Sequence, residues 1–272
     1  MPSKIITDAQ KDLIIKDYLS KPQTISEIAK RYNLSSPTIV KILGDTPRYK
    51  KSKVFSPLLK EDFFENIDTE RKAYFLGLLI SDGNVFKTPN KQHSISITLD
   101  KNDSYILEDF KESVGVTTKI SSDNRGCCYV AVRSDKMAMD LSQYGVVPRK
   151  SLKTFLPSIK QEMMPHLLRG ILDGDGSVRA METIVRNRFA HYIAFCGTKR
   201  LMEDISDFCF DALNLSVKPT LYVYKDKNLA ETRIQNKEDM NIFGNFIYKD
   251  ATIFLKRKKE VFDAFKSHYG LD

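Results

Sequence analysis

Two short segments of this 272-residue chain repeat each other in register, and this repeat constrains the fold more than any other feature. The first segment runs over residues 75–83 and the second over residues 168–176, 93 positions later. Each is an apolar, helix-like run that ends in Asp-Gly and is followed by a β-hairpin pattern. The surrounding helices and strands repeat as well, over about ninety residues, in too few copies for a solenoid. We therefore predict an α+β domain built from two similar halves.

Small residues recur four positions apart within each segment. They are Gly77 and Ser81 in the first copy and Gly170 and Gly174 in the second. On a helix this spacing places both members of a pair on one face, and two such faces can cross with their backbones close together. Glycine inside a helix costs about 1 kcal/mol relative to alanine, and close packing against a partner helix would explain that cost.

Each helix is followed by a glycine, Gly83 or Gly176, where a left-handed cap is favoured. Asp82 and Asp175 would then meet at two helix C-termini, where the partial charge is negative and like charges raise each other's pKa. A divalent cation resolves both problems, and oxygen ligands near phosphate favour Mg²⁺ or another divalent cation such as Mn²⁺. One Asp-Gly helix end often marks only a turn. Two in register predict a metal site at Asp82, Asp175, Gly83 and Gly176 that suits phosphodiester hydrolysis.

At these residues the sequence resembles the LAGLIDADG homing endonucleases in their single-chain, two-motif form, over roughly residues 69–272. The resemblance implies two pseudo-symmetric αββαββα halves, about 69–160 and 161–272, that form a saddle over DNA. It implies that Asp82 and Asp175 are the metal-binding catalytic acids of a Mg²⁺-dependent enzyme that cuts both strands of a long double-stranded target.

The resemblance also implies an active-site lysine in each half, Lys150 within residues 147–152 and Lys258 within residues 254–259. Such a lysine can stabilise phosphate charge or help to activate water. The alternative for residues 256–259 is a basic helix end. Many relatives carry a polar residue, often glutamine, near the end of the second strand of each half. No glutamine occurs in residues 97–100 or 195–198, which leaves that role unassigned.

DNA contacts of such a saddle come from strand faces, where polar side chains alternate with apolar ones. Arginine and glutamine can read base edges, and lysine mainly meets phosphate. The alternative for each residue is an ordinary solvated strand face. The candidates are Lys87, Ser94, Ser96, Thr98, Lys119, Arg179, Arg186, Arg188, Tyr222, Tyr224, Arg233 and Gln235.

The N-terminal residues 1–45 read as a separate helix-turn-helix domain. Helices are expected near 7–19, with Leu13 on the apolar stripe, after Thr24 with Glu27 completing a capping box, and after Ser35 or Ser36. The third helix would present Ser36, Thr38 and Lys41 to a major groove. Residues 46–68 read as a basic linker whose Lys50 and Lys51 would follow phosphates. A helical bundle for protein contacts is the alternative.

Composition narrows the class of protein further. Hydrophobic residues make up 42% of the chain, which argues against global disorder. No apolar run approaches the roughly 20 residues of a membrane span, and no secretion leader is recognised, so an intracellular location is expected. The four cysteines include no C-x-x-C pair and the four histidines are scattered, which favours reduced thiols and no zinc site.

Four other functions are alternatives to the endonuclease. A non-cleaving transcription regulator and an intron RNA maturase are both compatible with the fold, although regulators of this type often lack the acids. An intein is rejected because the chain begins Met1-Pro2 and ends Gly270-Leu271-Asp272, without the splicing residues. A helical adaptor without chemistry leaves the twin Asp-Gly ends unexplained. The partner is expected to be double-stranded DNA bound by a monomer.

Overall fold

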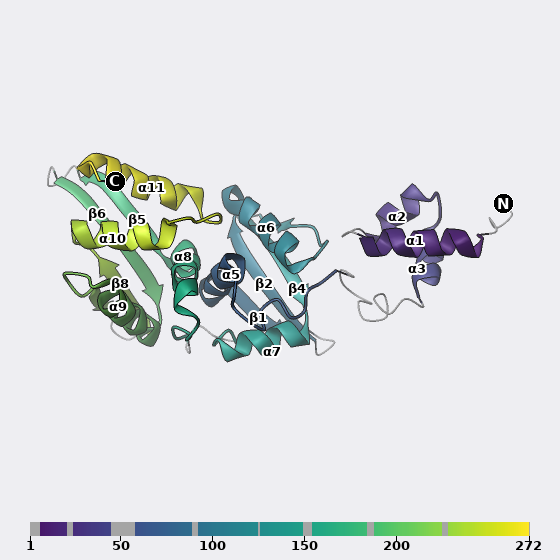
Figure 1. The fold of residues 1–272 in the computed structure, drawn as a ribbon, viewed down its shortest axis with the longest axis horizontal. Coiled ribbons are helices and arrows are strands. Elements are labelled where there is room, and N and C mark those ends of the chain that lie inside the picture. Colours follow the sequence, from purple (N-terminus) through teal and green to yellow (C-terminus); the bar gives the residue numbers. More distant parts are fainter. Residues whose placement is uncertain are drawn as a thin grey trace.

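Three short helices with a core of their own form the N-terminal part of the chain (Figure 1). They are α1 (Asp8–Ser20), α2 (Ile25–Arg31) and α3 (Ser36–Leu43). The computed structural model describes residues 6–20, 24–44, 58–88, 92–124, 126–148, 154–183, 188–224 and 228–271.

Local capping explains where α2 and α3 begin. The Thr24 side chain accepts from the Glu27 backbone N–H and the Glu27 carboxylate accepts from the Thr24 backbone N–H, so the predicted capping box is present. Ser35, rather than Ser36, caps α3. In α1 the predicted apolar stripe is wrong at Leu13, which is 57% exposed, because Ile14 and Tyr18 are the residues turned into the small core.

The first half of the larger part has the predicted order of helices and strands. Its elements are α5 (Glu70–Ser81), β1 (Gly83–Lys87), β2 (His93–Asp100), η1 (Lys101–Asp103), α6 (Ser104–Val114), β3 (Ser121–Ser122), β4 (Cys127–Arg133) and α7 (Asp135–Gln143). The antiparallel sheet has the strand order β1-β2-β4-β3, and α6 and α7 cover its inner face. The sequence is strand-like over residues 117–122, but only residues 121–122 pair with β4.

The second half repeats this arrangement. Its elements are η3 (Gln161–Met163), α8 (Met164–Asp175), β5 (Ser177–Thr183), β6 (Arg188–Gly197), α9 (Lys199–Leu213), β7 (Thr220–Val223), β8 (Ala230–Ile234), α10 (Lys237–Tyr248) and α11 (Lys256–Tyr269). The strand order β5-β6-β8-β7 matches that of the first sheet, and α9, α10 and α11 pack on it. The predicted fold class, two αββαββα halves, is confirmed.

The motif helices α5 and α8 lie side by side between the two sheets (Figure 1). Residues 73–80 of α5 and 167–173 of α8 are all buried, because each helix packs against its partner and against its own half. One hydrophobic cluster runs through both halves, so they form a single domain.

The described end of the predicted linker belongs to this core. Phe63, Phe64 and Ile67 are buried in the same cluster as α5, and the Lys60 backbone N–H donates to the Val114 carbonyl oxygen at 2.9 Å. The predicted boundary at residue 69 is therefore wrong for residues 58–68, because their apolar side chains pack on the first half.

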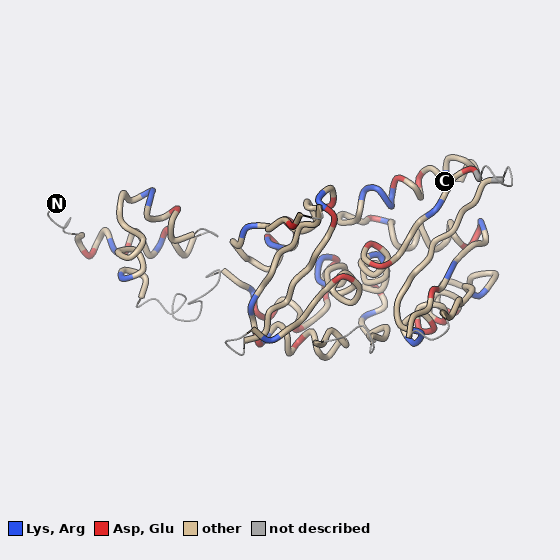
Figure 2. The backbone as a smooth tube through the Cα atoms, turned by 180° about the vertical axis from the view of Figure 1, so that it is seen from behind, with Lys and Arg blue, Asp and Glu red and all other residues tan. Residues whose placement is uncertain are grey.

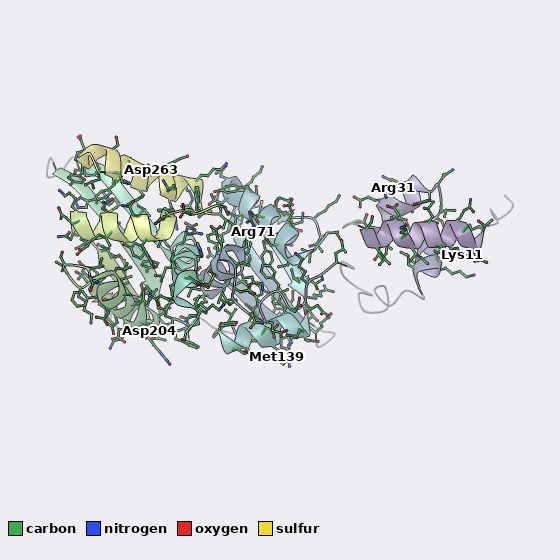
Figure 3. The ribbon with its side chains drawn as sticks, in the orientation of Figure 1. Lys11, Arg31, Arg71, Met139, Asp204 and Asp263 are labelled. Atoms are coloured by element: carbon green, nitrogen blue, oxygen red, sulfur yellow. The ribbon has the colours of Figure 1, made fainter. Side chains whose placement is uncertain are left out.

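Charged residues of both signs are interspersed along the chain (Figure 2). At the surface of the N-terminal helices, Lys11 pairs with Asp8 and Arg31 with Asp17 (Figure 3). Within the described ranges, no helix is long and apolar enough to cross a membrane.

Candidate active site

The backbones of α5 and α8 touch at the small residues of the repeated segments. A Cβ atom added to Gly77 would lie 2.2 Å from the Leu167 carbonyl oxygen, and one added to Gly170 would lie 2.1 Å from the Tyr74 carbonyl oxygen. One added to Gly174 would lie 1.9 Å from the Ser81 Oγ atom. No side chain can occupy these positions, so glycine is required for the close crossing.

This crossing sets the positions of the two candidate catalytic acids. Asp82 is the C-cap of α5, with its backbone N–H donating to the Leu78 carbonyl oxygen at 2.9 Å. Asp175 is the last residue of α8 and is exposed. The Asp82 Oδ2 atom lies 3.2 Å from the place where a Cβ of Gly174, the residue before Asp175, would stand. The structure therefore brings both acidic helix ends together.

The chemistry of these donors fits a hard divalent cation. Carboxylate oxygens at two helix C-termini gather negative charge, and the missing side chain at Gly174 leaves the Asp82 carboxylate room beside α8. Across the described residues, no group of three His, Cys, Asp or Glu side chains gathers as a cation site. Water and phosphate oxygens would complete the coordination of a cation held by Asp82 and Asp175.

The glycines after the acids do not adopt the predicted left-handed cap. Gly176 has φ −96° and ψ 172°, and Gly83 is not among the residues with positive φ. Their lack of a side chain has another cause, because a Cβ on Gly83 would lie 2.4 Å from the Leu79 carbonyl oxygen. A Cβ on Gly176 would lie 2.6 Å from the Leu172 carbonyl oxygen. Both glycines let the chain turn sharply from helix into strand.

Lys258 lies beneath the Asp175 helix end. It is 6% exposed, and its ammonium donates to the carbonyl oxygens of Leu172 (2.6 Å), Asp173 (2.8 Å) and Gly176 (2.7 Å). Burial lowers the pKa of Lys258 to about 8, against the opposing effect of the Asp173 and Asp82 charges. Lys258 thus caps the C-terminus of α8. The other predicted lysine, Lys150, lies outside the described residues.

The ends of the second strands lie near the acids in at least one half. Cys196 of β6 is half-buried, and its thiol pKa is raised by burial and by the negative charges of Asp175 and Glu231. Thr98, the matching residue of β2, is exposed. The unassigned position near the acids therefore carries a thiol in the second half and a hydroxyl in the first.

The outer face of the first sheet contains part of the predicted DNA-binding set. On this face Ser96 is half-buried and Thr98 is exposed. Lys87 is exposed but shares the opposite face with Val85, and the exposed Lys119 lies before β3 and outside the sheet. Ser94 is only 2% exposed, so the prediction that it contacts DNA is wrong in this structure. Its register partners Phe86 and Arg133 are larger residues in the same cross-strand row.

The outer face of the second sheet holds a cluster of aromatic and charged residues. The guanidinium of Arg233 lies 4.9 Å from the Tyr192 ring centroid and 4.8 Å from that of Tyr222. Glu231 accepts from the Arg233 guanidinium and from the Tyr224 hydroxyl, the latter at 3.0 Å. Tyr222, Tyr224 and Arg233 were predicted as DNA contacts, whereas Tyr192 and Glu231 were missed. Their outward-facing strand positions were the signal that could have found them.

The remaining predicted contacts of the second half are scattered. The Arg179 Nε atom is buried and has no hydrogen-bond partner in the described parts of the chain, and Gln235 is exposed. Arg188 begins β6, and Arg186 lies outside the described residues.

The first half of the larger part matches the model of a known protein family. A family model described as "LAGLIDADG-like domain" matches residues 69–160. No curated protein sequence matches the chain.

Solved structures share the LAGLIDADG fold over most of the chain. The LAGLIDADG meganuclease I-AabMI bound to uncleaved DNA has a TM-score of 0.52 at 14% identity, over 72% of this chain and 89% of that one. The meganuclease I-SmaMI bound to uncleaveable DNA gives 0.51 at 12% identity, over 73% and 91%. The homing endonuclease I-GzeII in complex with its DNA target gives 0.50 at 14%, over 72% and 88%. At these identities the likeness shows the fold.

The matched family model does not reach the N-terminal helices, so only their own residues indicate their role. On α3, Ser36 and Lys41 are exposed, and the Thr38 hydroxyl lies 2.7 Å from the Ser35 hydroxyl. Ser36, Thr38 and Lys41 all lie on α3, the helix predicted to present them to a major groove. Lys50 and Lys51 lie outside the described residues.

Proposed function

We propose that the chain is a site-specific DNA endonuclease that hydrolyses both strands of a long double-stranded target in a Mg²⁺-dependent reaction. The observation that carries this proposal is the pair Asp82 and Asp175 at the adjoining ends of two crossing helices. Two acids so placed next to two four-stranded sheets suit a substrate with two antiparallel phosphodiester strands.

In this proposal Asp82 and Asp175 bind the cation and each serves one strand. The divalent cation, when bound, lowers the pKa of a water nucleophile and stabilises the leaving oxygen. Lys258 holds the α8 end at which Asp175 stands, through its three carbonyl partners. Lys150 is proposed to stabilise phosphate charge or to help activate water for the first half.

The outer sheet faces are proposed to bind the DNA. Arg233, whose guanidinium lies close to the rings of Tyr192 and Tyr222, is proposed to read a base edge. Arg179, the register partner of Tyr192 on the same sheet face, is proposed to contact a base or a phosphate. The N-terminal helices are proposed to lengthen the bound site through α3, and the two halves of one chain make a second copy unnecessary.

Cleavage of a randomised double-stranded DNA library tests the proposal. The wild type is incubated with Mg²⁺ and with EDTA, beside the double variant Asp82→Asn, Asp175→Asn. We expect cutting at one long site with Mg²⁺ only, and a variant that binds the selected site without cutting it. Tight specific binding by the wild type without cutting in any divalent metal would contradict the proposal and leave a regulator or an RNA-splicing helper.

A further inference from the structure

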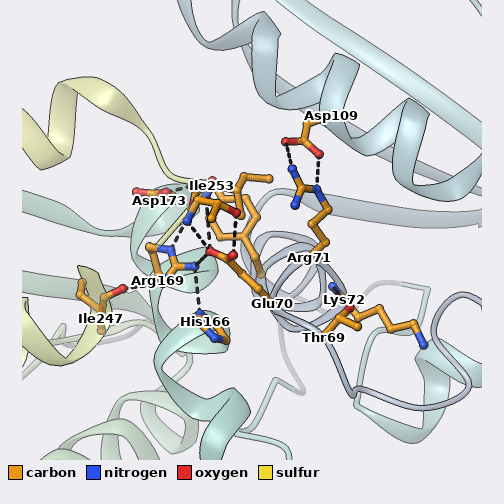
Figure 4. Close-up of polar contacts among 12 residues, drawn as sticks. Thr69, Glu70, Arg71, Lys72, Asp109, His166, Arg169, Asp173, Ile247 and Ile253 are labelled. Carbon is orange, nitrogen blue, oxygen red and sulfur yellow. Dashed lines mark hydrogen bonds and ion pairs between the residues drawn. The ribbon is translucent and has the colours of Figure 1, made fainter. Parts of the chain in front are cut away.

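A buried polar network joins the motif helices on one side of their crossing (Figure 4). Its centre is Arg169 of α8, which is 0% exposed. The Arg169 guanidinium donates to the carbonyl oxygens of Ile253 (2.8 Å) and Ile247, and it pairs with the Glu70 carboxylate of α5. It also lies 3.0 Å from the Nδ1 atom of His166. The guanidinium thereby links both motif helices to the chain that precedes α11.

Glu70 and Asp173 extend this link along residues 252–255. The Glu70 carboxylate accepts from the Thr252 backbone N–H (2.8 Å) and from its hydroxyl (2.6 Å). The Asp173 Oδ2 atom accepts from the Tyr74 hydroxyl (2.9 Å) and from the Leu255 backbone N–H (2.8 Å). Residues 252–255 are therefore fixed to one carboxylate on each motif helix.

The network reaches the turn that carries a candidate catalytic acid. Helix α11 begins directly after residues 252–255, and its Lys258 donates to the carbonyl oxygens of Leu172, Asp173 and Gly176. These three carbonyls stand on both sides of Asp175 in the chain. A shift of residues 252–255 would therefore move Lys258 and the end of α8 with it.

The other side of the helix crossing has no matching polar network on the motif helices. The repeat places Leu76 opposite Arg169 and Ile80 opposite Asp173, 93 positions earlier. Both are buried and apolar. The partners of the network, Tyr74 and Glu70, likewise correspond to Leu167 and Met163. Each network position is thus polar on one side of the crossing and apolar on the other.

We infer that this one-sided network positions Asp175 and not Asp82, so that the two strands of a target are cut by differently supported acids. The inference rests on the proposed endonuclease function. Glu70, Tyr74, Arg169 and Asp173 are positioning residues, because they act on Asp175 through residues 252–255 and Lys258. Misplacement by about 1 Å can cost roughly 100-fold in rate, so a loosened α8 end slows one strand selectively.

Strand-resolved cleavage by the full-length chain tests the inference. The selected target, labelled differently on its two strands, is cut by the wild type and by Asp173→Asn. The amide oxygen can still accept both hydrogen bonds, but the substitution removes the negative charge that interacts with Lys258 and Arg169. It also buries an N–H₂ group where the Oδ1 atom has no hydrogen-bond partner among the described residues, so the end of α8 must shift. We expect one strand to be cut about tenfold more slowly, with nicked DNA accumulating, since a displaced group loses rate without losing binding.

Two further variants serve as comparison. Ile80→Val changes the matching position of the first half and is expected to leave cutting of the strand served by Asp175 unchanged. Tyr74→Phe removes one hydrogen bond to Asp173 and is expected to give the same strand bias at smaller size, which keeps the test informative if Asp173→Asn does not fold.

Hydrogen exchange in EDTA supplies a readout that does not depend on cutting. In Asp173→Asn, and in Tyr74→Phe to a smaller extent, we expect faster amide exchange in residues 173–178 and unchanged exchange in residues 80–85. Equal slowing of both strands, or unchanged exchange in residues 173–178, would overturn the inference. A wild type that never cuts would instead count against the proposed function, while the exchange comparison would still decide whether the network supports only one helix end.

Discussion

Replacing Gly170 with alanine is the sharpest test of the helix crossing. The new Cβ atom would lie 2.1 Å from the Tyr74 carbonyl oxygen and 2.9 Å from the Leu78 backbone nitrogen. Ordinary contact begins at 3.4 Å, and both obstacles are backbone, so no side-chain rotation can make room. The two helices must therefore separate by about 1 Å, in the range where overpacking becomes costly.

The separation of the two helices is expected to lower both the stability of the fold and the rate of cleavage. Overpacking a core costs about 1–3 kcal/mol, and a clash between two backbones lies at the upper end because the helices move as units. Alanine returns about 1 kcal/mol of helix propensity. We expect a net loss of about 2 kcal/mol, which lowers Tm by roughly 4–8 °C in a domain of this size. Because the same movement draws Asp82 and Asp175 apart, cleavage should fall by roughly 100-fold.

Thermal unfolding followed by circular dichroism and cleavage of the selected target measure the two effects. Gly197→Ala is the matched control for stability, because its Cβ would meet only the movable ends of Met202 (3.2 Å) and Leu201 (3.3 Å). Its Tm should stay within about 2 °C of the wild type, as for tolerated substitutions. If Gly170→Ala unfolds at the wild-type temperature and cuts at the wild-type rate, the close crossing is not what holds the acids together.

Three further outcomes are expected. Arg233→Ala should weaken binding of the selected target by about tenfold or more and relax base preference at one position, measured by competition between target variants. Lys41→Ala should reduce the slope of log affinity against log salt by about one if α3 meets phosphate, and an unchanged slope would exclude that contact. The pKa of Glu70 is lowered from 4.5, because hydrogen bonds from Thr252 and the Arg169 charge outweigh the effect of burial. Its carboxylate therefore stabilises the fold above pH 4.5 and loses this effect as pH falls below 4.5 through the lower folded pKa. The stability deficit of Glu70→Gln should shrink over the same fall in pH, measured by pH-dependent unfolding.

Elements fixed by local patterns could be predicted from the sequence. The capping box at Thr24 and the alternation in β2 depend on neighbouring residues, and both are found where expected. The extent of β3 could not be predicted from the strand-like stretch 117–122, because only residues 121–122 pair with β4. The burial of Phe64 was missed for the same reason, since residues 58–68 carry linker-like local signals and pack through distant contacts.

In the candidate site, too, some residues could be predicted from local sequence, whereas others depend on contacts between distant segments. Asp82 and Asp175 follow from the repeat, because two segments in register place an Asp-Gly pair at the end of each motif helix. Lys258 could be assigned to the site region, but its three carbonyl partners depend on how α11 docks on α8. The prediction that Ser94 contacts DNA failed because strand alternation predicts on which face of the sheet a residue lies. It does not predict whether larger neighbours cover that residue.

The one-sided network also answers a problem that any duplicated fold has. The apolar faces of α5 and α8 are similar, so hydrophobic contact alone would let α5 pack on α8 or on a second copy of α5. Hydrophobic contact therefore cannot distinguish the two halves. Arg169 changes this, because a buried guanidinium must find its partners or pay heavy desolvation, and its partners lie in both halves and in residues 252–255. A pairing that placed Leu76 where Arg169 stands would leave Glu70 without its arginine. The network therefore specifies one arrangement of the two halves, and it does so through the same residues that fix the end of α8.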